Sequence, residues 1–220
     1  MKKIVGLLLV ALMATGLFAK TWTNNVGVGF ALPFNGFQVD TSNSKDLSPQ
    51  ISYDIQGMYL GYHENGFTVR GSLDLGVGTV KDFWYDAVKN ENEYGIGVDL
   101  REQIGVGYSF IRSEKFVLAL TAGIGLKETI IPRTETVLNT TTDTTGTIFL
   151  FDLGGDLTAL VRFSERFGMF FNMHAGFVPF GKFYTSSESK TGSTTTKEDK
   201  DYNLKTTYII APSLGFAWTF

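Results

Sequence analysis

The 220-residue chain contains no cysteine and only two histidines. The absence of cysteine excludes disulfides, thiolate metal sites, catalytic thiols and a lipidated N-terminal cysteine. The formal net charge of −3 provides no basic surface, so we expect no nucleic-acid partner. After residue 18, no segment approaches the ~18 consecutive apolar residues of a membrane-spanning helix. With few histidines and no clustered carboxylates on one rim, we also predict no metal site and no cofactor.

The first residues have the pattern of a secretory signal peptide. Lys2 and Lys3 form a basic start, the segment 4–18 is apolar, and Ala19 is a small residue at the expected cleavage point. The apolar segment is too short and wrongly flanked for a transmembrane helix. We therefore predict a signal peptide at 1–19 and a mature domain at 20–220.

The end of the chain alternates between large apolar and mostly small side chains. The large ones are Tyr208, Ile210, Pro212, Leu214, Phe216, Trp218 and Phe220. This alternation fits a transmembrane barrel strand whose outer face contacts lipid. Phe216, Trp218 and Phe220 resemble the C-terminal assembly signal of Gram-negative outer-membrane barrels, which ends in phenylalanine after alternating aromatic or apolar residues. The resemblance implies that the barrel-assembly machinery is a partner.

Seven earlier segments alternate in the same way. With the terminal segment they predict eight strands, at about 22–34, 49–62, 67–79, 93–110, 116–127, 147–163, 167–178 and 208–220. The 25 glycines and the 14% aromatic content suit a glycine-lined barrel ringed by aromatic residues. They suit a helical protein poorly, because glycine costs ~1 kcal/mol per helix-interior site relative to alanine.

The connections between these strands alternate in length. Short polar turns are expected at 63–66, 112–115 and 164–166, and long polar loops near 35–48, 80–92, 128–146 and 179–205. This alternation predicts an all-β fold, a transmembrane eight-stranded antiparallel up-and-down β-barrel with both termini in the periplasm. The four long loops would be extracellular, and their Ser- and Thr-rich tracts are expected to be mobile. Phe83, Trp84 and Tyr85 in the second loop are a candidate surface-interaction site.

A secreted β-sandwich or lipocalin would also alternate, but it would bury its largest side chains in the core. Here the face with small side chains and glycines is too poorly filled for a sandwich core, and all eight strands have a second face of large apolar side chains. The mature chain resembles the small eight-stranded Gram-negative outer-membrane barrels of the OmpA, OmpX, opacity-protein and OmpW type. The resemblance implies a monomer in the cell outer membrane, in contact with outer-membrane lipid and lipopolysaccharide.

Charged side chains on the predicted inner faces form a candidate polar network. Its members are Asp54, Arg70, Asp74, Asp99, Arg101, Lys127, Asp152, Asp156, Arg162 and His174. The predicted hairpins place Asp54 opposite Asp74, Asp99 opposite Lys127, and Asp156 opposite His174. An eight-stranded barrel is just wide enough to be filled by its own side chains.

Paired charges in so narrow an interior predict a closed barrel with a structural role, or one that contacts a host surface or small-molecule ligand through its loops. The alternative is a narrow porin-like channel for small polar or amphipathic solutes. His174 beside Asp156 could imitate part of a hydrolase triad. The sequence shows no nucleophile elbow, so we predict no catalytic residue and no enzyme.

Overall fold

The computed structural model describes residues 21–39, 48–81 and 94–220, which form nine antiparallel β-strands. The predicted signal peptide at 1–19 lies outside these residues. In the described part of the chain, no helix is long and apolar enough to cross a membrane. The strands are β1 (Trp22–Ala31), β2 (Phe34–Val39), β3 (Ser48–His63), β4 (Phe67–Lys81), β5 (Tyr94–Arg112), β6 (Phe116–Val137), β7 (Thr140–Arg162), β8 (Phe167–Thr191) and β9 (Thr194–Thr219).

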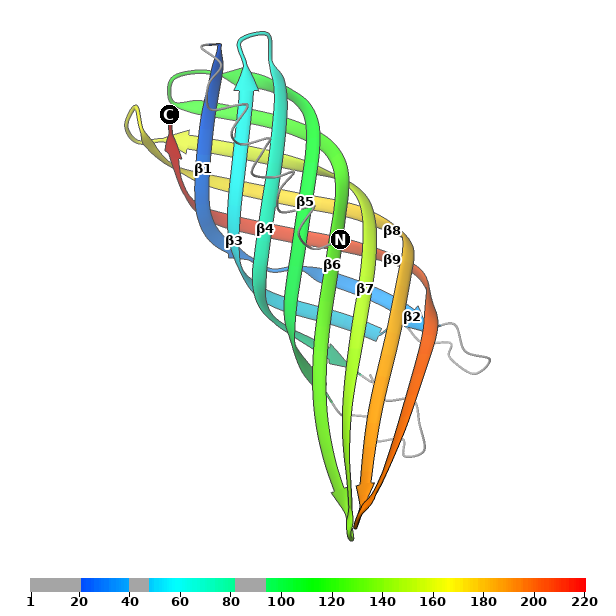
Figure 1. The fold of residues 1–220 in the computed structure, drawn as a ribbon. Coiled ribbons are helices and arrows are strands. Elements are labelled where there is room, and N and C mark those ends of the chain that lie inside the picture. The colour runs from blue at the N-terminus through cyan, green and yellow to red at the C-terminus, as the bar shows by residue number, and fades with distance from the viewer. Residues whose placement is uncertain (1–20, 40–47, 82–93) are drawn as a thin grey trace.

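The nine strands form a closed barrel with eight strand positions around its wall, and we call each position a stave (Figure 1). β1 and β2 are one stave, because both pair with β3 on one side and with β9 on the other. The stave is interrupted at Leu32 and Pro33, and proline has no N–H to donate. Leu32 N still donates to Pro212 O (2.9 Å), and Ser52 N donates to Pro33 O (2.9 Å). The wall therefore stays closed across the break, and the predicted eight-stranded antiparallel barrel is confirmed.

The three predicted short turns are confirmed at one end of the barrel. Gly66 N donates to His63 O (2.8 Å) in the first turn, where Gly66 has a φ of 97°. Ser113 N donates to Phe116 O (2.9 Å) in the second. The chain also ends here: Phe220 N donates to Asn24 O (2.8 Å), and Asn24 N donates to Phe220 O (3.4 Å). The seam between the first and last strands is thus bonded as far as the final residue.

Deletion of Phe220 is therefore expected to lower the amount of folded barrel in the outer membrane while secretion across the inner membrane continues. The deletion removes the last two hydrogen bonds of the seam and the end of the predicted assembly signal. The measurement is immunoblotting of separated membrane fractions, with boiled and unboiled samples compared. Normal outer-membrane levels of heat-modifiable protein would remove the assembly-signal argument.

A belt of large apolar side chains covers the outside of the barrel. It includes Val28, Phe30, Tyr53, Ile55, Leu75, Ile96, Val106, Leu120, Leu153, Phe171, Phe177, Leu214 and Phe216. The alternation of β3 also predicts an outward side chain at Tyr59, like those of Tyr53 and Ile55, but Tyr59 is buried and its hydroxyl donates to Asn24 Oδ1 (2.7 Å). Gly61 makes room for this ring, since a Cβ at Gly61 would collide with it.

Aromatic residues gather at both margins of the belt. At the short-turn end, Phe167 contacts Phe163, Phe216 and Trp218, and Trp22 contacts Phe67. At the far end, Phe149 contacts Phe180, with ring centroids 6.4 Å apart. On β9 the margins fall near 208 and 218, a distance of ten residues. At ~3.3 Å per residue and a ~40° tilt, this spans about 25 Å, the height of an outer-membrane apolar band.

Two of the four predicted long loops are strands instead. Residues 128–146 and 179–205 continue β6, β7, β8 and β9 far beyond the other staves, as Figure 1 shows. We call residues 131–148 and 181–204 the sheet extension. Two-residue turns close its hairpins at 138–139 and 192–193, with positive φ at Leu138 (55°) and Gly192 (60°).

Hydroxyl pairs explain why these polar tracts form strands. Within the extension, Thr142 bonds Ser189 (2.9 Å) and Thr140 bonds Thr191 (2.7 Å) across β7 and β8. Threonine favours extended backbone, and such cross-strand pairs stabilise a sheet. Of the other two predicted loops, the first begins with β2. Phe83, Trp84 and Tyr85 in the second lie outside the described residues.

Candidate functional site

Charged side chains are buried inside the barrel, in two groups. One part centres on Arg70 (1% exposed), whose Nη1 lies 3.1 Å from Asp156 Oδ1. Asp156 Oδ1 also accepts a hydrogen bond from Asn172 Nδ2 (3.1 Å). His174 Nδ1 lies 3.3 Å from Asp156 Oδ2, and its Nε2 lies 2.9 Å from Asp152 Oδ2. Strands β4, β7 and β8 thus contribute to one ionic cluster.

A second part centres on Lys127 of β6. Its Nζ lies 3.0 Å from Asp99 Oδ2 and donates to Asn35 Oδ1 (2.8 Å) and Ser52 Oγ (3.1 Å). Asn35 in turn donates to Gln50 Oε1 (2.7 Å). Asn35 is 92 residues from Lys127 in the chain and comes from the broken first stave. These neutral partners belong to the network, and the charge pattern of the sequence did not reveal them.

The register of two hairpins differs from the prediction. Asp54 lies opposite Gly76, so Gln56 and not Asp54 faces Asp74. Gln56 Nε2 donates to Asp74 Oδ1 (2.9 Å), and Arg101 Nη1 lies 3.6 Å from Asp74 Oδ2.

Lys127 lies opposite Arg101 and reaches Asp99 diagonally. The predicted facing of Asp156 and His174 is confirmed. The errors are two residues each, because the length of a turn does not by itself set the first bonded pair.

Arg162 stands apart from the ionic clusters. It is half-buried at the short-turn end of β7, where its guanidinium donates to Tyr62 OH (2.8 Å), Asn25 Oδ1 (3.2 Å) and Thr219 Oγ1 (3.1 Å). Its predicted place in the interior polar network is thus only partly correct, because these partners are neutral. Arg162 instead ties β7 to the seam strands β1 and β9.

Two buried apolar clusters bound the ionic layer. Towards the far end lie Val80, Ile131, Ile148, Leu150, Val178, Phe183, Leu204, Ile209 and Ala211, with Tyr202 packed against them. Towards the short turns lie Met58, Leu60, Tyr62, Val117, Ala119, Leu160, Phe170 and Ala217. Along β7, for example, Leu150 precedes and Leu160 follows the polar stretch that holds Asp152 and Asp156. Along β6, β7 and β8 the inward side chains are therefore apolar, ionic and apolar in turn, whereas on β4 they stay polar from Asp74 to Thr68 at the short-turn end.

A row of inward glycines makes room for the network. Gly105, Gly123, Gly154 and Gly176 pair directly across β5, β6, β7 and β8. A Cβ at Gly176 would stand 2.8 Å from His174 Nε2 and 3.0 Å from Asp152 Oδ2. The sequence shows these glycines, but only the register shows that they lie side by side.

No protein-family model matches the sequence, and no curated protein sequence matches it. Among solved structures, a major outer membrane protein from Thermus thermophilus matches with a TM-score of 0.57 at 12% identity, covering 88% of this chain and 99% of that chain. Ail, the attachment invasion locus protein of Yersinia pestis, matches with a TM-score of 0.48 at 12% identity, covering 90% and 99%. The outer membrane protease OmpT from Escherichia coli matches with a TM-score of 0.45 at 9% identity, covering 92% and 98%.

The fold is that of an outer-membrane β-barrel. The likeness to the Thermus protein, together with the apolar belt and its aromatic margins, confirms the predicted outer-membrane barrel. At these identities the similarity concerns the fold alone.

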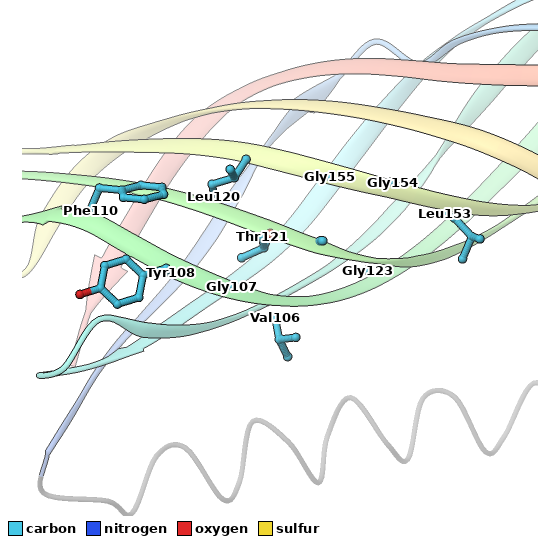
Figure 2. Close-up of a pocket in the computed structure, with 11 residues that line it drawn as sticks. Val106, Gly107, Tyr108, Phe110, Leu120, Thr121, Gly123, Leu153, Gly154 and Gly155 are labelled. Atoms are coloured by element: carbon cyan, nitrogen blue, oxygen red, sulfur yellow. The ribbon is translucent and has the colours of Figure 1, made fainter.

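On the lipid-facing side of this barrel, a shallow groove of about 740 Å³ crosses β5, β6 and β7. Figure 2 shows Val106, Leu120 and Leu153 around a stretch of wall whose glycines carry no side chains. Ala122 and Gly155 are paired neighbours there, and both are small. The lining is apolar apart from Tyr108 and Thr121, so the groove fits the lipid-facing surface.

In the described part of the chain, no group of three or more His, Cys, Asp or Glu residues is arranged to hold a metal ion. The described carboxylates of the interior face Arg70, Arg101, Lys127 or His174, with Asp54 the exception. Asp54 is 2% exposed, and neither of its carboxylate oxygens has a hydrogen-bond partner.

Proposed function

We propose that the protein is an integral outer-membrane barrel with a closed, structural interior, and that its sheet extension is the surface that contacts the cell exterior. The observation that carries the proposal is the order of inner residues along the strands. On β6, β7 and β8 each polar segment is bounded by buried apolar residues on both sides. Water and ions would have to cross both apolar layers to pass through the barrel.

The same geometry argues for a structural role of the ionic layer. A buried ion pair is costly when one partner is missing, so the network favours a single arrangement of the strands that carry it. A catalytic role for His174 is disfavoured, because carboxylates face both ring nitrogens and leave neither free to take a proton from a nucleophile.

A narrow channel for small polar or amphipathic solutes is the second candidate. The observation in its favour is that several buried polar atoms of the ionic layer have no hydrogen-bond partner. They include both carboxylate oxygens of Asp54, Gln56 Oε1 and Ser213 Oγ. Such atoms usually bind water, and a continuous file of water would make the interior conductive.

Planar-bilayer recording of the refolded protein separates the two candidates. A closed interior predicts no steady current from the unmodified protein. Phe170→Ala with Phe183→Ala removes one large ring from each apolar layer and is expected to produce measurable openings. Phe171→Ala, on the outer face next to Phe170, is the matched control and should show no channel openings. Steady, ion-selective conductance of the unmodified protein would favour the channel.

The orientation of the barrel can be tested by cysteine labelling, which is clean because the chain has no cysteine of its own. Ser193→Cys in the turn of the sheet extension is expected to react with a membrane-impermeant maleimide on intact cells. Glu165→Cys in a short turn is exposed to a similar degree but should react only after the outer membrane is opened. Labelling at 165 but not at 193 on intact cells would invert the topology and overturn the proposal.

A further inference from the structure

The sheet extension ends in an exposed edge on β9. In the described part of the chain, residues 194–203 of β9 pair only with β8, because the pairing with β2 stops at Val39 and Leu204. The side chains of this segment are exposed or half-exposed, with Glu198 at 65%. An edge strand offers a row of backbone N–H and C=O groups to a further strand.

The charges on this edge have a self-complementary order. The sequence Lys197-Glu198-Asp199-Lys200-Asp201 can pair with a second copy of itself in the antiparallel direction, centred on Asp199. Lys197 then lies opposite Asp201 of the second copy, and Glu198 lies opposite Lys200 of the second copy. Opposite charges in directly facing positions stabilise an antiparallel pair. Asp199 faces its own counterpart, with Lys197 of the second copy one diagonal step away.

This order also selects how the two copies are related. Two barrels in one membrane are related by rotation about the membrane normal, so their β9 edges would run in the same direction. Lys197 would then lie beside Lys197 and Glu198 beside Glu198, which is destabilising. Two barrels in facing membranes present their edges in opposite directions. Asp199 is nine residues beyond Tyr208 at the belt margin, or ~30 Å along the strand, so the edge stands well clear of the membrane.

We propose that the β9 edge at 194–203 is a homophilic contact site, through which copies anchored in two facing membranes pair antiparallel about Asp199. The inference rests on the proposed function, since it requires the sheet extension to lie outside the cell. Backbone hydrogen bonds provide the attraction, and the charges set the register and the direction. Within its own membrane the protein remains a monomer.

The test uses two populations of phosphatidylcholine vesicles, each carrying the refolded full-length protein and one of two fluorescent lipids. Clustering is measured as energy transfer between the two lipids. Vesicles with the unmodified protein are expected to cluster, and Glu198→Lys should lower clustering at least tenfold, because a lysine then faces Lys200 of the second copy. Glu135→Lys is the matched control: Glu135 lies on the opposite edge strand β6, is 55% exposed, and likewise pairs with a basic residue two positions away. It should cluster like the unmodified protein.

The exchange of both charges is the decisive variant. Glu198→Lys with Lys200→Glu keeps the net charge and the ion pair within the strand, and the facing residues on β8, Ser187 and Thr185, are uncharged. Vesicles with the exchanged protein should cluster with one another but not with the unmodified protein, because like charges meet in the mixed pair. Loss of folding cannot produce this result, and heat-modifiable gel mobility verifies each variant.

Three outcomes would overturn the inference. They are no clustering of the unmodified protein at any density, an equal loss with Glu135→Lys, or clustering of exchanged with unmodified vesicles as strong as that of unmodified vesicles with one another. The labelling of Ser193→Cys on intact cells shows which proposal has failed. If position 193 is labelled and the vesicles do not cluster, only the homophilic contact is wrong. If 193 is not labelled, the proposed function falls as well.

Discussion

Arg70→Ala is expected to destabilise the folded barrel by about 3–5 kcal/mol, the usual cost of removing one partner of a buried ion pair. The guanidinium of Arg70 is 1% exposed and lies 3.1 Å from Asp156 Oδ1. Alanine leaves Asp156 with Asn172 and His174 but without its arginine, in a layer enclosed by apolar side chains. The measurement is urea unfolding of the protein in lipid vesicles, followed by tryptophan fluorescence and by gel mobility of unboiled samples.

Lys182→Ala is the control for the Arg70 substitution. Lys182 also forms an ion pair, with Asp201 at 3.3 Å, but it lies in the sheet extension and Asp201 is largely exposed. An exposed pair contributes about 0–1 kcal/mol, so the unfolding midpoint should hardly move. Equal effects of the two substitutions would mean that the interior is well hydrated, as the channel alternative requires.

Gly29→Ala is expected to disrupt closure of the barrel, with a loss of about 3 kcal/mol or failure to form the heat-resistant species. Gly29 of β1 pairs with Gly215 of β9 at the seam. A Cβ at Gly29 would stand 2.7 Å from Gly215 Cα and 2.8 Å from Leu214 C. These are backbone atoms, which cannot rotate away like the end of a side chain. The two strands must therefore separate to admit a single methyl group.

Gly57→Ala provides the matched control, because Gly57 lies on the neighbouring strand β3 opposite Val28. There a Cβ would meet only Leu73 O, at an ordinary 3.7 Å. We expect a change within about 0.5 kcal/mol, as for substitutions that disturb no contact. Both variants are compared by gel mobility and urea unfolding. A seam that tolerates Gly29→Ala as well as Gly57→Ala would show that β1 and β9 are not held at this close approach.

The sequence by itself determined the architecture of the wall. Lipid surrounds every membrane-spanning strand, so each strand repeats the same local rule of large apolar residues at every second position. That rule needs no knowledge of neighbouring strands. It placed Tyr208 and Trp218 on the outer face, located the three short turns, and led to eight staves despite the break at Pro33.

The outer part of the sheet extension could not be predicted in this way, because both of its faces are polar there. Beyond the buried Ile131 and Ile148 at its base, Thr142 and Thr144 lie on one side and Thr141 and Asp143 on the other. No alternation of polarity marks a strand there, and the composition resembles a solvated loop. Pairing with neighbouring strands, through hydroxyl bonds such as Thr142 to Ser189, decides the structure.

The interior depended most on tertiary structure. Charge alternation identified Arg70, Lys127 and Asp156 as inward, but their partners depend on the register of each hairpin and on strands far apart in the chain. Lys127 meets Asn35 only because the ring closes, and His174 fits beside Asp152 only because Gly154 and Gly176 leave space in the wall. The outer face of a barrel is set by its solvent, residue by residue. The inner face is set by which side chains the closed ring brings together.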